Sequence, residues 1–242
     1  MAKTLNSLWD PPFPFPRGAE DVPPKGILAA GPGLTELLKI RAPETLKKRC
    51  HLFGRGGTAL YAGRDFFLAG PVLGAPMAVM ALEILSGGGA EELLFSGYAG
   101  SLRADLRPGS LFLPERALST EGVSAHYSPD LSPDPSLLEK LRKTARETGF
   151  VRSGTVWTTD APMRETPKLR ERQKKLGAEA VEMEVSAVFS AARFRALKAA
   201  ALLLITDVFD EDGWRGGPGG RERGEALEPL LKLAWKTLAA PL

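Results

Sequence analysis

The feature that most constrains this chain is a short, wholly apolar run that ends in an acid. The run covers residues 199–205, and Thr206-Asp207 follows it directly. Seven apolar residues in a row are too few to cross a membrane and are typical of a strand buried on both faces. Open α/β sheets place their sites at the carboxyl ends of such strands. Asp207 is therefore expected at a functional edge of a sheet.

A second acidic segment, Val181-Glu182-Met183-Glu184, precedes a stretch with helical spacing. Apolar residues recur through residues 185–197 with a period that predicts a helix, and Glu184 would lie in its first turn. The helix dipole favours a carboxylate there. Charged groups in apolar surroundings are costly unless they are hydrogen-bonded or used. Two interpretations stay open: a functional site, or a Glu184 that only complements the dipole and an Asp207 that only opens a loop.

The composition is that of one ordinary globular domain. The chain has 242 residues, of which 43% are hydrophobic and 25% charged, which suffices for a single α/β domain with a full core. The net charge of +3 comes from 32 basic and 29 acidic residues that are interspersed. The densest basic run, residues 168–175, contains Glu171 and indicates a solvated helix face. Nucleic acid is therefore not expected as a partner.

Cysteine and histidine usage argues against a disulfide framework and a metal site. Cys50 is the single cysteine, and the two histidines, His51 and His126, are far apart in sequence. A reducing compartment, the cytoplasm, is expected, with no metal. No apolar stretch is long enough for a membrane span, so no membrane partner is expected.

The first 24 residues differ from the rest of the chain. Six prolines lie between Pro11 and Pro24, and Trp9, Phe13 and Phe15 accompany them. Proline cannot donate to a strand ladder and favours extended geometry. We expect residues 1–24 to form an arm that docks on its own domain or on a neighbouring subunit, with a floppy tail as the alternative. Residues 25–242 would form the domain.

Periodicity and glycine punctuation predict the remaining elements. Glycines are dense in residues 213–224, which indicates a mobile loop, either a lid or a disordered connection. Strands are expected at residues 26–30, 64–69, 92–95, 106–114, 151–157 and 199–205, and helices at residues 34–38, 77–85, 135–149, 185–197 and 225–238.

The two acidic segments together resemble the nucleoside phosphorylase family, which includes purine nucleoside phosphorylases, uridine phosphorylases and nucleosidases. The resemblance rests on Val-Glu-Met-Glu, a helix of small residues and a strand that ends in Thr-Asp. Ala81-Leu82-Glu83-Ile84-Leu85 is similar to the family's Ala-x-Glu-x-Leu helix. The resemblance covers about residues 26–240 and implies an α/β fold, a three-layer α/β/α sandwich around a mixed, twisted central sheet. It also implies a homo-oligomer in which neighbours complete each site.

The resemblance implies a role for each acid. Glu184 would hold the ribose hydroxyls, Met183 would pack under the sugar, and Asp207 would face the base as the catalytic acid. Cleavage of an N-glycosidic bond builds positive charge on the sugar, which a carboxylate stabilises, and an acid can protonate the departing base. Base-binding residues would be Thr159, Met163 and Glu182. Asp207, and the lack of recognisable uracil-reading residues in residues 158–166, favour a purine-like base.

The expected phosphate site departs from the family pattern. Gly31, Arg49 and Tyr98 are the phosphate-binding candidates, with Arg49 able to serve a neighbour's site. Thr35 and Phe95 stand where family phosphorylases have phosphate-binding arginines.

Because arginine holds phosphate best, these two departures leave three functions open: a phosphorylase with phosphate as co-substrate and no other cofactor, a nucleosidase that uses water, or a non-catalytic nucleoside-binding protein. Residues 121–127 resemble a uridine phosphorylase segment and favour phosphorolysis. Glu36, one residue off the place of a nucleosidase glutamate, is a weak signal for hydrolysis.

Overall fold

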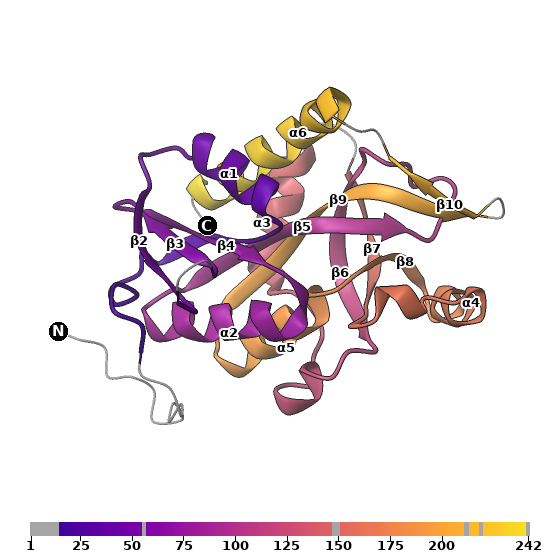
Figure 1. Cartoon of the computed structure of the whole chain (residues 1–242), viewed down its shortest axis with the longest axis horizontal. Coiled ribbons are helices and arrows are strands. Elements are labelled where there is room, and N and C mark those ends of the chain that lie inside the picture. The colour runs from indigo at the N-terminus through magenta and orange to yellow at the C-terminus, as the bar shows by residue number, and fades with distance from the viewer. Residues whose placement is uncertain (1–14, 55–56, 147–150, 211–212, 218–219, 241–242) are drawn as a thin grey trace.

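A twisted mixed sheet forms the middle layer of the molecule (Figure 1). The computed structural model describes residues 15–54, 57–146, 151–210, 213–217 and 220–240, so Trp9 and Phe13 of the predicted arm lie outside the described residues. Its strands are β1 (Lys25–Ala30), β2 (Lys47–His51), β3 (Ala59–Ala62), β4 (Phe66–Val72), β5 (Glu92–Ser101), β6 (Leu111–Ser119), β7 (Val151–Thr158), β8 (Ala178–Glu182), β9 (Lys198–Asp210) and β10 (Gly213–Gly216).

The strand order contains a closed ring. Along the sheet the order is β10-β9-β6-β7-β8-β5-β1-β4-β3-β2, and β9 also pairs with β5. This extra parallel pairing closes β5, β9, β6, β7 and β8 on themselves. The parallel strands β1 and β4 and the antiparallel strands β3 and β2 extend the sheet outward from β5. The mixed sheet predicted from the sequence is confirmed, and the closure of its five-stranded part is an addition.

Helices cover both faces of the sheet (Figure 1). On one face lie α1, α3 and α6, whose leucines form one apolar cluster with the strands, and on the other lie α2 and α5 with a second cluster. The three-layer arrangement is therefore confirmed. The helices are α1 (Pro32–Ile40), α2 (Gly74–Gly87), α3 (Pro135–Arg146), α4 (Pro167–Lys175), α5 (Val185–Phe194) and α6 (Gly220–Ala239), with short 3-10 turns η1 (Ser124–His126) and η2 (Pro162–Arg164).

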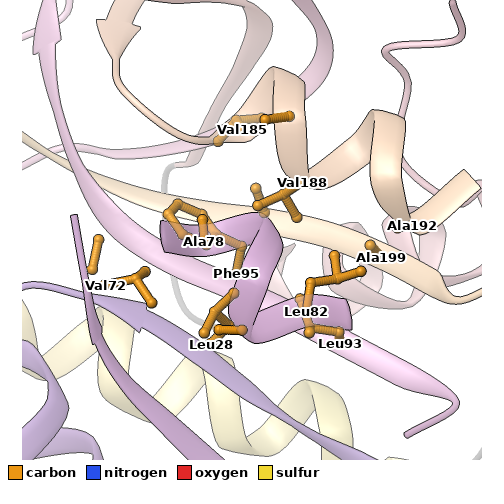
Figure 2. Packing of buried hydrophobic residues seen from close by; sticks show 14 of the residues in the cluster. Leu28, Val72, Ala78, Leu82, Leu93, Phe95, Val185, Val188, Ala192 and Ala199 are labelled. Carbon is orange, nitrogen blue, oxygen red and sulfur yellow. The ribbon is translucent and has the colours of Figure 1, made fainter. Parts of the chain in front are cut away.

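The layer under α2 and α5 is packed from small and branched side chains. Figure 2 shows Ala78 and Leu82 of α2 and Val188 of α5 around Phe95 of β5. Alanines at the contact let the helices approach one another and the sheet closely, and the buried apolar area stabilises the fold. The core thus fixes the start of α5, where Glu184 lies.

The apolar run at residues 199–205 is buried as predicted, since none of its side chains is more than 2% exposed. The strand is longer than predicted because β9 continues to Asp210 and pairs with β10. The prediction of a mobile loop at residues 213–224 is therefore wrong for Gly213–Gly216, which form β10, and for the residues from Gly220 on, which begin α6. Strand pairing outweighs the glycine content here.

The described part of the arm docks on its own domain. Val22 donates its N–H to the carbonyl of Gly88, and the carbonyl of Pro24 accepts from the N–H groups of Glu91 and Glu92. Ala19 is fully buried. Residues 15–24 therefore lie over the end of α2 rather than projecting as a tail.

The described residues contain no helix long and apolar enough to cross a membrane. Among the same residues, no cluster of histidine, cysteine, aspartate or glutamate could hold a metal ion.

Candidate functional site

The acidic segments predicted from the sequence meet at the carboxyl end of β5. Gly100 pairs with Val181 of β8 on one side and with Asp207 of β9 on the other. The register between β5 and β9 shifts at this point, so that Ala99 pairs with Ile205 and Thr206 is passed over. Such a bulge re-aims the next side chain. The ring of strands therefore brings the segment of Glu182 and Glu184 and the residue Asp207 to the same end of the ring, which we call the rim.

Asp207 is half-buried and has donors on both carboxylate oxygens. The Thr206 hydroxyl donates to Oδ1 at 2.8 Å, and the Trp214 indole N–H donates to Oδ2 at 3.0 Å. A Cβ at Gly100 would lie 2.8 Å from Oδ2. The carboxylate therefore lies over Gly100, and β10 supplies a partner that the sequence analysis missed.

Glu184 lies between two helix starts. It is the N-cap residue of α5, one position earlier than predicted, and its Oε1 accepts the N–H of Gly74, the first residue of α2, at 2.6 Å. The side chain is almost fully buried, at 4% exposure. Burial raises the pKa of Glu184, against hydrogen bonds from Gly74, Met183 and the Glu182 carboxyl that lower it. Helix N-termini stabilise negative charge, so Glu184 has a structural role beside the expected ribose contact.

Glu182 is the more deeply constrained acid. Its Oε2 accepts the N–H groups of Glu184 and Val185 at 2.7 and 2.8 Å, and its Oε1 accepts the Thr158 hydroxyl at 2.5 Å. Burial, together with the charge of Glu184, raises the pKa of Glu182 to about 8. Glu182 therefore holds a proton at neutral pH, and its partners make it a support for the chain beside Glu184.

Two of the three expected base-site residues, Thr159 and Glu182, lie near the rim together with Met183, which was expected under the sugar. Thr159 is buried and donates its N–H to the carbonyl of Glu182 at 2.9 Å. Met183 is half-buried between Glu182 and Glu184. Met163, by contrast, lies on η2 with 95% of its surface exposed. The structure thus brings Thr159, Met183 and the acids together and leaves Met163 in solvent.

Two of the three expected phosphate-site residues touch each other. Gly31 has a φ of 90° and precedes α1, whose first turn has no cap from a described side chain. A Cβ at Gly31 would lie 3.1 Å from the ring of Tyr98, so the glycine allows the ring to pack there. The free N–H groups of a helix start favour anions.

Arg49 is not part of this cluster within one chain. It lies on β2, at the far edge of the sheet, and donates to the carbonyls of Glu20 and Asp21 at 3.1 and 3.0 Å. Phe95 is fully buried in the core, and the Thr35 hydroxyl donates to the carbonyl of Gly31. The positions that carry arginines in the resembled phosphorylases therefore present no cation here.

A buried polar network supports the rim from below. Glu121 accepts from the hydroxyls of Ser119, Ser124 and Ser186. The N–H of Ser186 in turn donates to the Thr158 hydroxyl that holds Glu182. Residues 121–127 thus anchor the start of α5, while His126 within them is exposed. The spacing of Glu121 and Ser124 could have indicated this role.

Glu165 is a further acid that sequence reasoning passed over. It lies between η2 and Thr166, the N-cap residue of α4, and its Oε2 is buried without a hydrogen-bond partner among the described residues. Asp207 is close enough for its charge to raise the pKa of Glu165. Its place in Arg164-Glu165-Thr166, within the segment expected over the base, was the available signal.

Two hollows of the described surface have neither Glu184 nor Asp207 in their lining. One of about 240 Å³ opens at the end of α5, next to Lys198 at the opposite end of β9. Another of about 650 Å³ is lined by Arg107, Val208 and Arg215. Because successive side chains of a strand point to opposite faces, Val208 places this hollow on the face of the β9–β10 ribbon opposite to Asp207. The expectation that Glu184 and Asp207 face one shared cavity therefore stays a prediction.

Comparison with known proteins agrees with this architecture. The family model described as the phosphorylase superfamily matches residues 26–228. The chain therefore belongs to the phosphorylase superfamily, as the two acidic segments predicted.

Individual relatives are distant. A guanosine phosphorylase of Halorubrum lacusprofundi is 30% identical over 151 residues, which cover 61% of this chain and 63%, less than two thirds, of that protein. A DeoD-type purine nucleoside phosphorylase of Streptococcus pyogenes is 26% identical over 196 residues, covering 78% of this chain and 81% of its own length. The structure of purine nucleoside phosphorylase from Toxoplasma gondii in complex with immucillin-H superimposes with a TM-score of 0.80 over 91% of this chain and 92% of that one. At 21% identity, this likeness shows the shared fold alone.

Proposed function

We propose that this protein cleaves the N-glycosidic bond of a purine nucleoside with phosphate as the acceptor, as a pentosyltransferase. The observation that carries the proposal is that Val181, three residues before Glu184, and Asp207 lie on opposite sides of Gly100, in a chain of the phosphorylase superfamily. The names of the relatives, guanosine phosphorylase and purine nucleoside phosphorylase, support a purine base.

The chemistry assigns a task to each end of the rim. At the sugar end, the buried Glu184 carboxylate binds the ribose hydroxyls and stabilises the positive charge that develops as the bond to the base stretches. Met183, half-buried beside it, packs under the sugar. At the base end, Asp207 forms a hydrogen bond with the base. Breaking the bond sends its electron pair to the base nitrogen, and a phosphate oxygen forms the new bond to the sugar carbon.

Among the described residues, the candidate binding site for phosphate is the start of α1. Gly31 leads into the helix without a side-chain cap from the described residues, and the Tyr98 ring lies against it. Arg49 would reach a neighbouring subunit's phosphate site, which requires a homo-oligomer. No cofactor besides phosphate is part of the proposal.

Hydrolysis by water is the second candidate function. Thr35 and Phe95, both buried, leave the phosphate site without the two arginines of the resembled phosphorylases, which favours this alternative. Against it, Glu36 points away from the rim, because it pairs with Lys39 at 3.1 Å on the exposed side of α1.

Base release with and without phosphate separates these functions. Inosine, guanosine, adenosine and uridine would each be incubated with the protein, and the free base measured by chromatography. We expect release of a purine base only when phosphate is present. Equal release without phosphate would replace phosphorolysis by hydrolysis. Saturable binding without release would indicate a nucleoside-binding protein.

A further inference from the structure

The hollow on the face of the β9–β10 ribbon opposite to Asp207 has a positively charged lining. Its volume is about 650 Å³, and the described residues that line it include Arg107 and Arg215 but no acid, beside the apolar Ala104, Pro108 and Val208. A concave surface lined by charges of one sign concentrates ions of the opposite sign. The hollow therefore favours an anion, at a place separate from the rim.

The turn that carries Arg107 is fixed to β9. The N–H of Gly109 donates to the carbonyl of Ile205 at 2.8 Å, and the N–H of Ile205 donates to the carbonyl of Ser110 at 2.9 Å. Within the turn, the N–H of Ser110 donates to the carbonyl of Arg107 at 3.1 Å. These bonds hold one wall of the hollow at a point of β9 two residues before Asp207.

The strand β10 and the residue after it form the second wall. Arg215 pairs with Val208 of β9, and the N–H of Gly217 donates to the carbonyl of Thr206 at 2.6 Å. A Cβ at Gly217 would lie 2.7 Å from the Cβ of Pro108, so the two walls touch there. The two arginines therefore extend from walls whose backbones are held in place.

The guanidinium of Arg107 is available to a ligand. Arg107 is exposed, and its side chain makes no hydrogen bond or ion pair with the described residues. Asp105, the acid in the same turn, is engaged elsewhere, because both of its carboxylate oxygens accept from Arg103 and Arg152 lies 3.6 Å away. Asp105 therefore does not neutralise the charge of the hollow.

We infer that this hollow binds the phosphate group of a phosphate monoester between Arg107 and Arg215. The planar guanidinium groups of arginine match the oxygens of phosphate and bind them by charge-assisted hydrogen bonds. A volume of about 650 Å³ is in the range of small-molecule sites and exceeds what one phosphate fills. Ala104, Pro108 and Val208 would therefore contact a sugar or base attached to the phosphate. This site is distinct from the phosphate site at the start of α1 and does not rest on the proposed function.

Occupancy of the hollow acts on Asp207 through β10. Arg215 is adjacent to Trp214, whose indole N–H donates to the Oδ2 of Asp207 at 3.0 Å. A phosphate group that joins Arg215 to the fixed turn of Arg107 holds β10, and with it Trp214, in place. The Trp214 side chain is 63% exposed, so its fluorescence emission responds to a ligand bound on the ribbon.

Calorimetric titration with three probes tests the inference. Guanosine 5′-monophosphate, ribose 5-phosphate and inorganic phosphate would each be titrated into the parent protein, Arg107→Gln and Arg116→Gln. Arg116 is an exposed arginine of β6 outside this hollow, so the control loses the same charge. We expect the Kd of both esters to rise about tenfold or more in Arg107→Gln, and to stay within about twofold of the parent in Arg116→Gln. Ala104→Glu, which adds an acid to the lining, should weaken both esters as well.

Fluorescence gives a second readout. The emission of Trp214, taken as the difference between the parent protein and Trp214→Phe, should change when either ester is added to the parent, and should not change in Arg107→Gln at the same ester concentration. An emission that does not respond in the parent would overturn the action on Asp207 through β10.

The remaining outcomes each decide one part of the inference. An ester Kd that is equal in Arg107→Gln and the parent, or no ester binding to the parent, would overturn the site. Inorganic phosphate that binds as tightly as the esters would overturn the assignment to a monoester. Because the titration measures binding, a parent protein that cleaves no nucleoside would overturn the proposed function and not this inference.

Discussion

Glu182 and Glu184 are two residues apart and have different surroundings. Glu182 is enclosed by N–H groups and by the Thr158 hydroxyl, whereas Glu184 accepts one N–H from α2. The two acids could be found in the sequence because charge is rare in apolar surroundings. The sequence could not predict which of the two acids carries a proton, because the protonation state depends on the burial that the fold imposes.

The proton on Glu182 predicts a pH-dependent stability. Its pKa is raised from 4.5 to about 8 on folding, so its contribution to the free energy of unfolding is fully present below about pH 4.5 and lost as the pH rises to about 8. Glu182→Gln is uncharged at every pH and keeps an oxygen for the N–H groups of Glu184 and Val185. We expect its Tm to fall less between about pH 5 and pH 8 than that of the parent protein in thermal unfolding. Parallel curves for the two proteins would contradict this protonation state.

Glu184 is expected to separate substrate binding from folding. Glu184→Gln keeps an oxygen for the Gly74 N–H but binds the ribose hydroxyls more weakly and loses the charge that stabilises the transition state, so KM for the nucleoside should rise about tenfold and kcat should fall, with a similar Tm. Glu184→Ala leaves that N–H unpaired and should lower the Tm as well. Steady-state kinetics and calorimetry of the two variants would check this. An unchanged KM in Glu184→Gln would contradict the proposed contact between Glu184 and the ribose.

At the scale of elements, the rim is made by the end of β5 and by the shift of register at Thr206. The strands and helices with clear periodicity, such as the buried run of β9, could be predicted from local pattern. The pairing of β9 with both β5 and β6, and the strand β10, could not, because long-range register decides them. The same limit hid Trp214 as a partner of Asp207.

Gly100→Ala tests whether the backbone of β5 positions Asp207. The new Cβ would lie 2.8 Å from the Asp207 Oδ2, closer than real side chains approach, so the carboxylate must move. We expect about a 10²-fold loss of kcat, because small misplacements of catalytic groups have large effects, with a modest change in Tm. Gly122→Ala, which adds a methyl group in open space, is the matched control. Activity equal to that control would show that Asp207 tolerates displacement.

For the molecule as a whole, α2 and α5 act as one layer under the sheet, and a buried ion pair joins them. Arg195 donates to Glu83 at 2.6 Å, and both side chains are only 11% exposed. Burial and the same glutamate raise the pKa of Tyr127 to about 12. The Ala-x-Glu-x-Leu pattern located Glu83 correctly, but its partner, the C-cap residue of α5, lies 112 residues away and left no local signal.

Removal of Arg195 should destabilise the whole fold. Arg195→Met leaves Glu83 charged and buried without its cation, which costs about 3 kcal/mol of unfolding free energy. Arg64→Met removes a pair with Asp65 on the surface, where the Arg64 side chain is 87% exposed, and should change the free energy of unfolding far less, because solvent screens the pair. Urea titration would measure both. Similar losses in the two variants would show that the buried pair is unimportant.

The closed ring of β5, β9, β6, β7 and β8 separates what must stay rigid from what can vary. A closed sheet has no edge strand whose register can shift, so the acids on its rim keep their mutual spacing when the connecting segments change. Residues of η2 and α4 can then be replaced without changing the pairing of the strands in the ring.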